Sequence, residues 1–74
     1  MKTTQDVEID FRHYGKIKVP KGTRVTNKTA SGIDTRYFFV DEFEWIDRDY
    51  PQIAFGLHWD AEYYGINIPK DFIE

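Results

Sequence analysis

The chain has 74 residues, of which 18% are aromatic, with a formal net charge of −3 and no cysteine. A chain of this length predicts a single small domain over residues 1–74, near the lower limit for a self-sufficient hydrophobic core. Disulfides and thiolate metal sites are excluded. No apolar run approaches the roughly 20 residues that cross a bilayer, and no apolar leader is present, so we expect a cytoplasmic protein without membrane contact.

The first half of the chain predicts strands. Residues 6–12 alternate charged and apolar side chains, which is typical of a half-buried strand, and residues 13–16 predict a turn. The alternation resumes over residues 16–19, so a first hairpin is expected. A short strand is expected over residues 23–27, and the small and polar residues 27–35 predict a loop.

The second half is less uniform. Aromatic and β-branched residues favour a strand over residues 36–40, whereas residues 41–49 fit either a turn or one short helix. A last strand is expected over residues 64–68, where Pro69 ends the ladder because it lacks an N–H donor.

Residues 53–59 carry Ile, Phe, Leu and Trp at odd positions, and this period of two predicts a strand. The alternative is a helix over residues 50–64. Gly56 counts against that helix, because glycine costs a helix roughly 1 kcal/mol relative to alanine.

These elements predict a mainly β fold, with α+β as the alternative. We expect a small antiparallel sheet or partly open barrel of five to six short strands, with at most one short helix. Such a sheet has exposed edges, so a homodimer is expected. The inward positions of the strands predict one shared core of Ile9, Phe11, Val19, Val25, Phe55, Leu57, Tyr64 and Ile66.

His58 and Asp60 are the most suggestive catalytic or metal-binding pair, because residues two apart lie on one side of a strand. A metal site needs three or four ligands, and His13 is the only other imidazole in the sequence. We therefore interpret His58 as a solvent-facing residue at a hairpin end and Asp60 as a turn former. Nucleophile-elbow, calcium-loop and phosphate-loop patterns are also missing, so neither an enzyme nor a cofactor is expected.

Charge is distributed unevenly along the chain. Residues 12–36 hold seven Lys or Arg against one Asp (net +6), whereas residues 37–74 hold nine acids against two bases (net −7). Opposite charges either mix on the folded surface or remain on two faces, one of which binds a partner.

The densest acidic stretch surrounds two aromatic side chains. Carboxylates spaced around aromatic anchors can imitate the charge of nucleic acid while a partner's pocket holds the rings. A protein-binding surface is therefore predicted at Asp41, Glu42, Phe43, Glu44, Trp45, Asp47 and Asp49. The alternative places both aromatic side chains in the core, with the acids as their solvated flanks.

The basic segment over residues 12–28 offers a second interpretation. Small β-barrels bind single-stranded nucleic acid through cations mixed with aromatic platforms. The residues for such a site are Arg12, Tyr14, Lys16, Lys18, Lys21 and Arg24. The alternative is a charged outer face that protects an edge strand from aggregation.

Two segments, VPKGTRVTNKT at residues 19–29 and YYGINIP at residues 63–69, resemble short uncharacterised proteins of phages, plasmids and other bacterial mobile elements. The similarity extends over residues 17–69. It implies an accessory protein that acts by binding, and some proteins of this kind inhibit host defence systems such as restriction or CRISPR complexes. The resemblance assigns no site residue.

Overall fold

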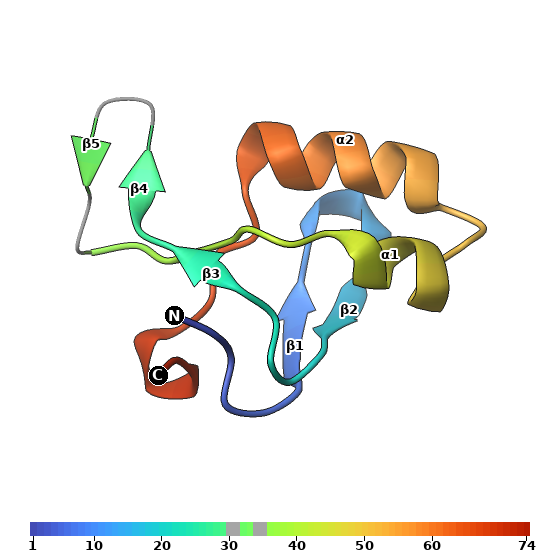
Figure 1. The fold of residues 1–74 in the computed structure, drawn as a ribbon. Coiled ribbons are helices and arrows are strands. Elements are labelled where there is room, and N and C mark those ends of the chain that lie inside the picture. The colour runs from blue at the N-terminus through green and yellow to red at the C-terminus, as the bar shows by residue number, and fades with distance from the viewer. Residues whose placement is uncertain (30–31, 34–35) are drawn as a thin grey trace.

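The chain folds into short antiparallel strand pairs and two α-helices, and the computed structural model describes residues 1–29, 32–33 and 36–74 (Figure 1). The strands are β1 (Val7–Asp10), β2 (Lys16–Val19), β3 (Val25–Thr26), β4 (Lys28–Thr29), β5 (Gly32–Ile33) and β6 (Phe39–Val40). The α-helices are α1 (Glu44–Asp49) and α2 (Ala54–Tyr64), and the 3₁₀ helices are η1 (Arg12–Tyr14) and η2 (Lys70–Phe72).

The fold is therefore a small α+β domain, which was the alternative to the mainly β prediction. Within the described residues the strands pair two by two, and no closed barrel forms. The expectation of at most one short helix was wrong, because α2 occupies residues that were assigned to a strand. None of the helices in the described part of the chain could span a bilayer.

The β1–β2 hairpin confirms the first predicted element. Val7 pairs with Val19 and Ile9 with Ile17, so the alternating apolar side chains of both strands share one face. The turn between the strands is η1, followed by Gly15 at φ 76°, a left-handed conformation that glycine adopts without strain.

Residues near both ends of the chain form backbone hydrogen bonds with each other and with the segment that contains β3. The N–H of Thr3 donates to the carbonyl of Thr23, and the N–H of Val25 donates to the carbonyl of Met1. Lys2 and Glu74 exchange two backbone hydrogen bonds, of 3.1 and 3.0 Å. These bonds place both termini beside β3, at the edge of the molecule away from α2 (Figure 1).

β3 and β6 lie within the strands predicted over residues 23–27 and 36–40, and they pair with each other although both are short. The segment from Ile66 to Ile68 runs along β6, because the N–H of Val40 donates to the carbonyl of Ile66 and that of Ile68 to the carbonyl of Phe38. Ile66 is buried as predicted, and Ile68 is buried as well. The strand expected over residues 64–68 is not formed, because Tyr64 belongs to α2 and only an isolated bridge joins Asn67 to Phe39.

The loop predicted over residues 27–35 contains a short antiparallel strand pair. β4 pairs with β5 through Lys28 with Ile33 and Thr29 with Gly32. Residues 30–31 and 34–35 of this prediction lie outside the described residues.

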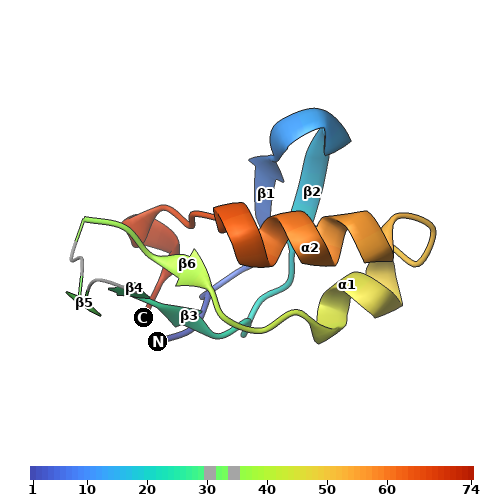
Figure 2. The ribbon, with the colours of Figure 1, turned by 90° about the horizontal axis from the view of Figure 1, so that it is seen from above.

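α1 confirms the short helix that was one alternative for residues 41–49. It buries Trp45 and Ile46 and lies beside α2 (Figure 2). α2 shows that the strand predicted over residues 53–59 was wrong and that the helical alternative was right. Leu57 and Ala61, four residues apart, form its buried face.

The predicted core is partly correct. Phe11, Val19, Val25, Leu57 and Ile66 are buried and Ile9 is half-buried, whereas Phe55 and Tyr64 lie on the surface. The error at Phe55 arises because a helix turns the side chain at position 55 away from that at position 57, whereas a strand places them on one side. Tyr64 is the last residue of α2.

A stability comparison tests this reversal. Leu57→Ala should lower the free energy of unfolding by about 2–5 kcal/mol, because the leucine side chain is fully buried. Phe55→Ala should change it by less than about 0.5 kcal/mol, because its ring is 94% exposed. Urea denaturation midpoints of both variants measure the difference, and equal losses would contradict the helix.

Candidate protein-binding surface

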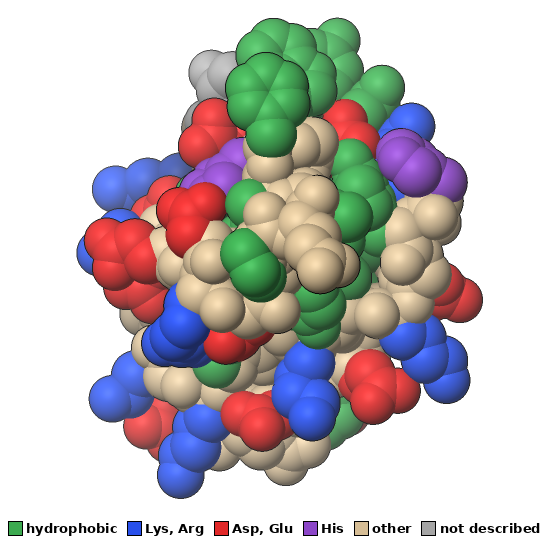
Figure 3. Space-filling model, turned by 90° about the vertical axis from the view of Figure 1, so that its right-hand side faces the viewer, with side chains coloured by type: hydrophobic (Ala, Val, Ile, Leu, Met, Phe, Trp, Pro, Cys, Tyr) green, Lys and Arg blue, Asp and Glu red, His purple; other side chains and the backbone are tan. Residues whose placement is uncertain are grey.

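The outer face of α2 carries three exposed aromatic side chains in line. Phe55, Trp59 and Tyr63 are spaced by four residues, so they lie one above the next along the helix. Their side chains are 94%, 68% and 72% exposed, and the Trp59 and Tyr63 rings stack with a 6.4 Å centroid separation. We call these residues the aromatic row; Figure 3 shows hydrophobic side chains gathered over α2 at the top of the molecule.

The β1–β2 turn holds one side of α2. The Tyr14 hydroxyl donates a 2.8 Å hydrogen bond to Oδ2 of Asp60, and the Arg12 guanidinium lies 3.6 Å from the centre of the Tyr64 ring. Gly56 makes room for this contact, because a Cβ at that position would lie 2.9 Å from the Tyr14 hydroxyl oxygen. The turn therefore fixes the helix that carries the aromatic row.

The contact between the β1–β2 turn and α2 affects the pKa of Tyr14 and involves an uncommon backbone conformation at Arg12. The hydrogen bond to Asp60 raises the pKa of Tyr14, because ionisation would lose the donor, and partial burial and the Asp60 charge act in the same direction. Arg12 adopts φ 50°, a left-handed conformation that is uncommon outside glycine. This backbone position is the one from which its guanidinium reaches Tyr64.

α1 borders the other side of the aromatic row. Nε2 of His58 and Oδ1 of Asp47 lie 3.1 Å apart, within hydrogen-bond distance, and the Phe43 ring lies 6.3 Å from the imidazole. His58 is therefore a half-buried helix residue that contacts α1, which corrects its interpretation as a solvent-facing residue at a hairpin end. Asp60 likewise lies within α2 and not in a turn.

A hollow of about 500 Å³ opens between α1 and the aromatic row. We call it the α1–α2 hollow; it is lined by Asp47, Phe55, His58, Trp59 and Glu62.

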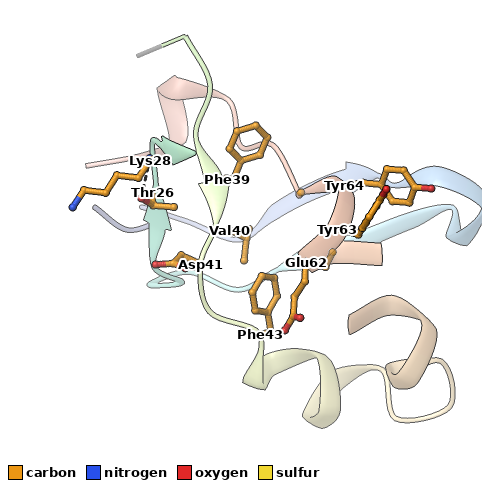
Figure 4. Close-up of a pocket in the computed structure, with 11 residues that line it drawn as sticks. Thr26, Lys28, Phe39, Val40, Asp41, Phe43, Glu62, Tyr63 and Tyr64 are labelled. Carbon is orange, nitrogen blue, oxygen red and sulfur yellow. Dashed lines mark hydrogen bonds between the residues drawn. The ribbon is translucent and has the colours of Figure 1, made fainter. Parts of the chain in front are cut away.

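A second groove, of about 440 Å³, continues from Glu62 and Tyr63 toward β3 and β6 (Figure 4). Val40, Phe43 and Ala61 give it apolar walls. The aromatic row thus has a concave surface on the α1 side and another beyond its C-terminal end.

The predicted acidic site separates into buried and exposed parts. Trp45 is 3% exposed and its indole N–H donates to the carbonyl of Glu42 at 2.7 Å, while Phe43 is half-buried against the core. Both aromatic side chains thus follow the alternative that placed them in the core. The carboxylates of Asp41, Glu44, Asp47 and Asp49 remain on the surface, and that of Glu42 is half-buried.

Arg48 is the one cation of α1, and it binds Asp49 through two hydrogen bonds of 2.9 and 3.2 Å. These bonds lower the pKa of Asp49, because they stabilise its ionised form. Arg48 is thereby engaged within its own helix.

The predicted basic site is interspersed with acids. Nζ of Lys16 lies 3.7 Å from Glu8, Lys18 faces Glu8 across the β1–β2 ladder, and Nε of Arg24 lies 3.5 Å from Asp41. The other residues of this prediction are Tyr14 and Arg12, which engage α2 as described, and Lys21, whose backbone N–H donates to Asp6. These acids lower the positive potential that the segment offers to phosphates.

Sequence reasoning missed the aromatic row, although its signal was present. Phe55, Trp59 and Tyr63 recur every four residues, and this spacing has a meaning only if the segment is helical. Among residues 1–29, 32–33 and 36–74, no group of three His, Asp or Glu side chains is placed to hold a metal ion. Comparison of the chain with protein-family models, curated proteins and solved structures finds no match.

The fit between Tyr14 and Gly56 can be measured by substitution. Gly→Ala in an open helix position stabilises by roughly 1 kcal/mol. We expect Gly56→Ala to bring no such gain in the wild-type chain, because the new Cβ displaces the Tyr14 hydroxyl from Asp60. In a Tyr14→Phe background the same substitution should stabilise by about 1 kcal/mol. Urea unfolding of the four proteins gives this coupling, and equal gains in both backgrounds would contradict it.

Proposed function

We propose that this chain is a non-enzymatic binding protein that docks on another protein through the aromatic row. The observation that carries the proposal is the exposure of Phe55, Trp59 and Tyr63 on the face of α2 opposite Leu57. Burying these large aromatic side chains in a pocket of the partner is favourable, at about 25 cal/mol per Å² of apolar surface removed from water. Tryptophan and tyrosine are also enriched among residues that dominate binding energy.

Rigid presentation supports the same proposal. Hydrogen bonding through Tyr14 and the cation–π contact of Arg12 fix α2 before a partner arrives. A surface that is already ordered loses less conformational entropy on binding than a mobile one.

The exposed acids of α1 extend the surface. These acids were part of the predicted acidic site, and they remain part of the proposed surface. The aromatic anchors are now the residues of the aromatic row in place of Phe43 and Trp45. In its narrower form, the proposal is that the protein is an accessory factor of a phage or plasmid that inhibits a restriction or CRISPR complex. This narrower form is supported by the resemblance to short proteins of mobile elements.

Site-specific photocrosslinking tests the docking surface. p-Benzoylphenylalanine at position 59 should give a discrete covalent adduct with one host protein in cells that contain the partner. Adding Phe55→Ala and Tyr63→Ala should weaken the adduct several-fold, because anchor residues contribute most of the binding energy. Ile33 on β5 is exposed to the same 68% as Trp59, so position 33 is the matched control. Equal labelling from positions 33 and 59 would contradict the proposal.

An oligonucleotide titration tests the competing nucleic-acid function. Proteins that bind through phosphate contacts lose affinity steeply with salt. Because Lys16, Lys18 and Arg24 each have an acid beside them, we expect no binding of a single-stranded oligonucleotide at low salt. Binding that is weakened by Lys16→Glu or Lys18→Glu would favour the nucleic-acid function instead.

A further inference from the structure

We infer that the α1–α2 hollow receives a lysine or arginine side chain of the partner protein, next to apolar side chains that cover Phe55 and Trp59. The inference rests on the proposed function, and it adds the chemistry of the partner. The occupant is a segment of the partner in which a cation is flanked by aliphatic residues.

Charge is the first argument. Asp47 and Glu62 face the α1–α2 hollow, and none of the residues that line it is Lys or Arg. The two helices together carry five carboxylates and one cation, a formal charge of −4, and that cation, Arg48, is bonded to Asp49. A partner cation placed here would meet two carboxylates; Glu62 has no Lys or Arg beside it among the lining residues, and Asp47 shares only Oδ1 with Nε2 of His58.

The aromatic lining is the second argument. A cation over the face of an aromatic ring is attracted by the ring quadrupole, and tryptophan gives the strongest attraction. Phe55 and Trp59 border the same hollow as the two carboxylates, so one side chain could contact both kinds of group. The fold already uses this chemistry where Arg12 lies 3.6 Å from the centre of the Tyr64 ring.

The same charges disfavour two other occupants. A second copy of the chain, packed through its own α2, would bring Glu62 toward an identical acid, because α2 has no Lys or Arg. A membrane surface rich in anionic lipid would be repelled for the same reason. Charge complementarity therefore selects a basic protein segment.

Defined peptides provide the test. The full chain is titrated with a 14-residue amphipathic peptide of Leu and Lys, and with the Leu and Glu peptide of the same pattern. The indole N–H signal of Trp59 in a ¹⁵N NMR spectrum reports binding, and that of the buried Trp45 is the internal reference. We expect the Leu and Lys peptide to bind at least about ten-fold more tightly, with an affinity that falls as salt increases.

Paired charge variants locate the site. Asp47→Asn with Glu62→Gln should weaken binding of the Leu and Lys peptide about five-fold, because two partly screened charge contacts are lost. Asp71→Asn with Glu74→Gln removes the same two charges from the surface near the C-terminus and should change affinity less than about two-fold. Trp59→Ala, which lacks the indole reporter and is therefore measured by titration calorimetry beside the wild-type chain, should weaken binding more than the charge variants do.

The outcomes separate this inference from the proposed function. If Trp59→Ala weakens binding but both charge pairs have equal effects, the docking surface stands and the cation assignment is overturned. Equal binding of the two peptides overturns it as well, as does a lack of binding by the Leu and Lys peptide. Sedimentation that shows a dimer lost in Trp59→Ala would assign the surface to a second copy, and binding to anionic vesicles lost in the same variant would assign it to a membrane.

Discussion

The arrangement of this molecule depends on how a single helix is shared between a small core and the solvent. Leu57 and Ala61 belong to the same buried cluster as Ile17 of the β1–β2 hairpin and Ile46 of α1. A chain of 74 residues has too little apolar volume to surround an 11-residue helix, so only one face of α2 is covered. The remaining face is free to carry residues chosen for another purpose.

That sharing explains why the hairpin was predictable from sequence and α2 was not. Val7, Ile9, Ile17 and Val19 alternate with charged residues because one side of β1 and β2 faces water. In α2 apolar residues occupy both faces, so the signal of a one-sided helix is lost. Ile53, Phe55, Leu57 and Trp59 then fall on alternate positions and imitate a strand.

Gly56 strengthened that misleading pattern. A glycine inside a helix lowers helical propensity, and taken alone it favours the strand interpretation. Its cause lies 42 positions away, in the hydroxyl of Tyr14, which occupies the space of a Cβ. No local window of sequence contains that contact, so propensity could not reveal it.

At the candidate surface, residues that are close together in the sequence are not the ones that are exposed together. The stretch from Asp41 to Asp49 concentrates acids and aromatic residues, yet folding sends Trp45 inward and leaves the carboxylates outside. The exposed rings come from α2, and His58 with Asp47 connects the two elements. The acidic part of the candidate surface could be predicted from the sequence. Its aromatic part could not, because Phe55, Trp59 and Tyr63 align only once residues 54–64 are known to be helical.

The backbone bonds between Lys2 and Glu74 close the chain into a ring of contacts. Fraying of either end removes hydrogen bonds from the other, so the two ends open together and not independently. Thr3 and Thr4 extend this seam to Thr23 and to Phe72. Disorder that starts at one terminus thus reaches β3, whose Val25 belongs to the same buried cluster as Leu57 of α2. The N–H groups of Lys2 and Glu74 should therefore open to amide hydrogen exchange with similar free energies.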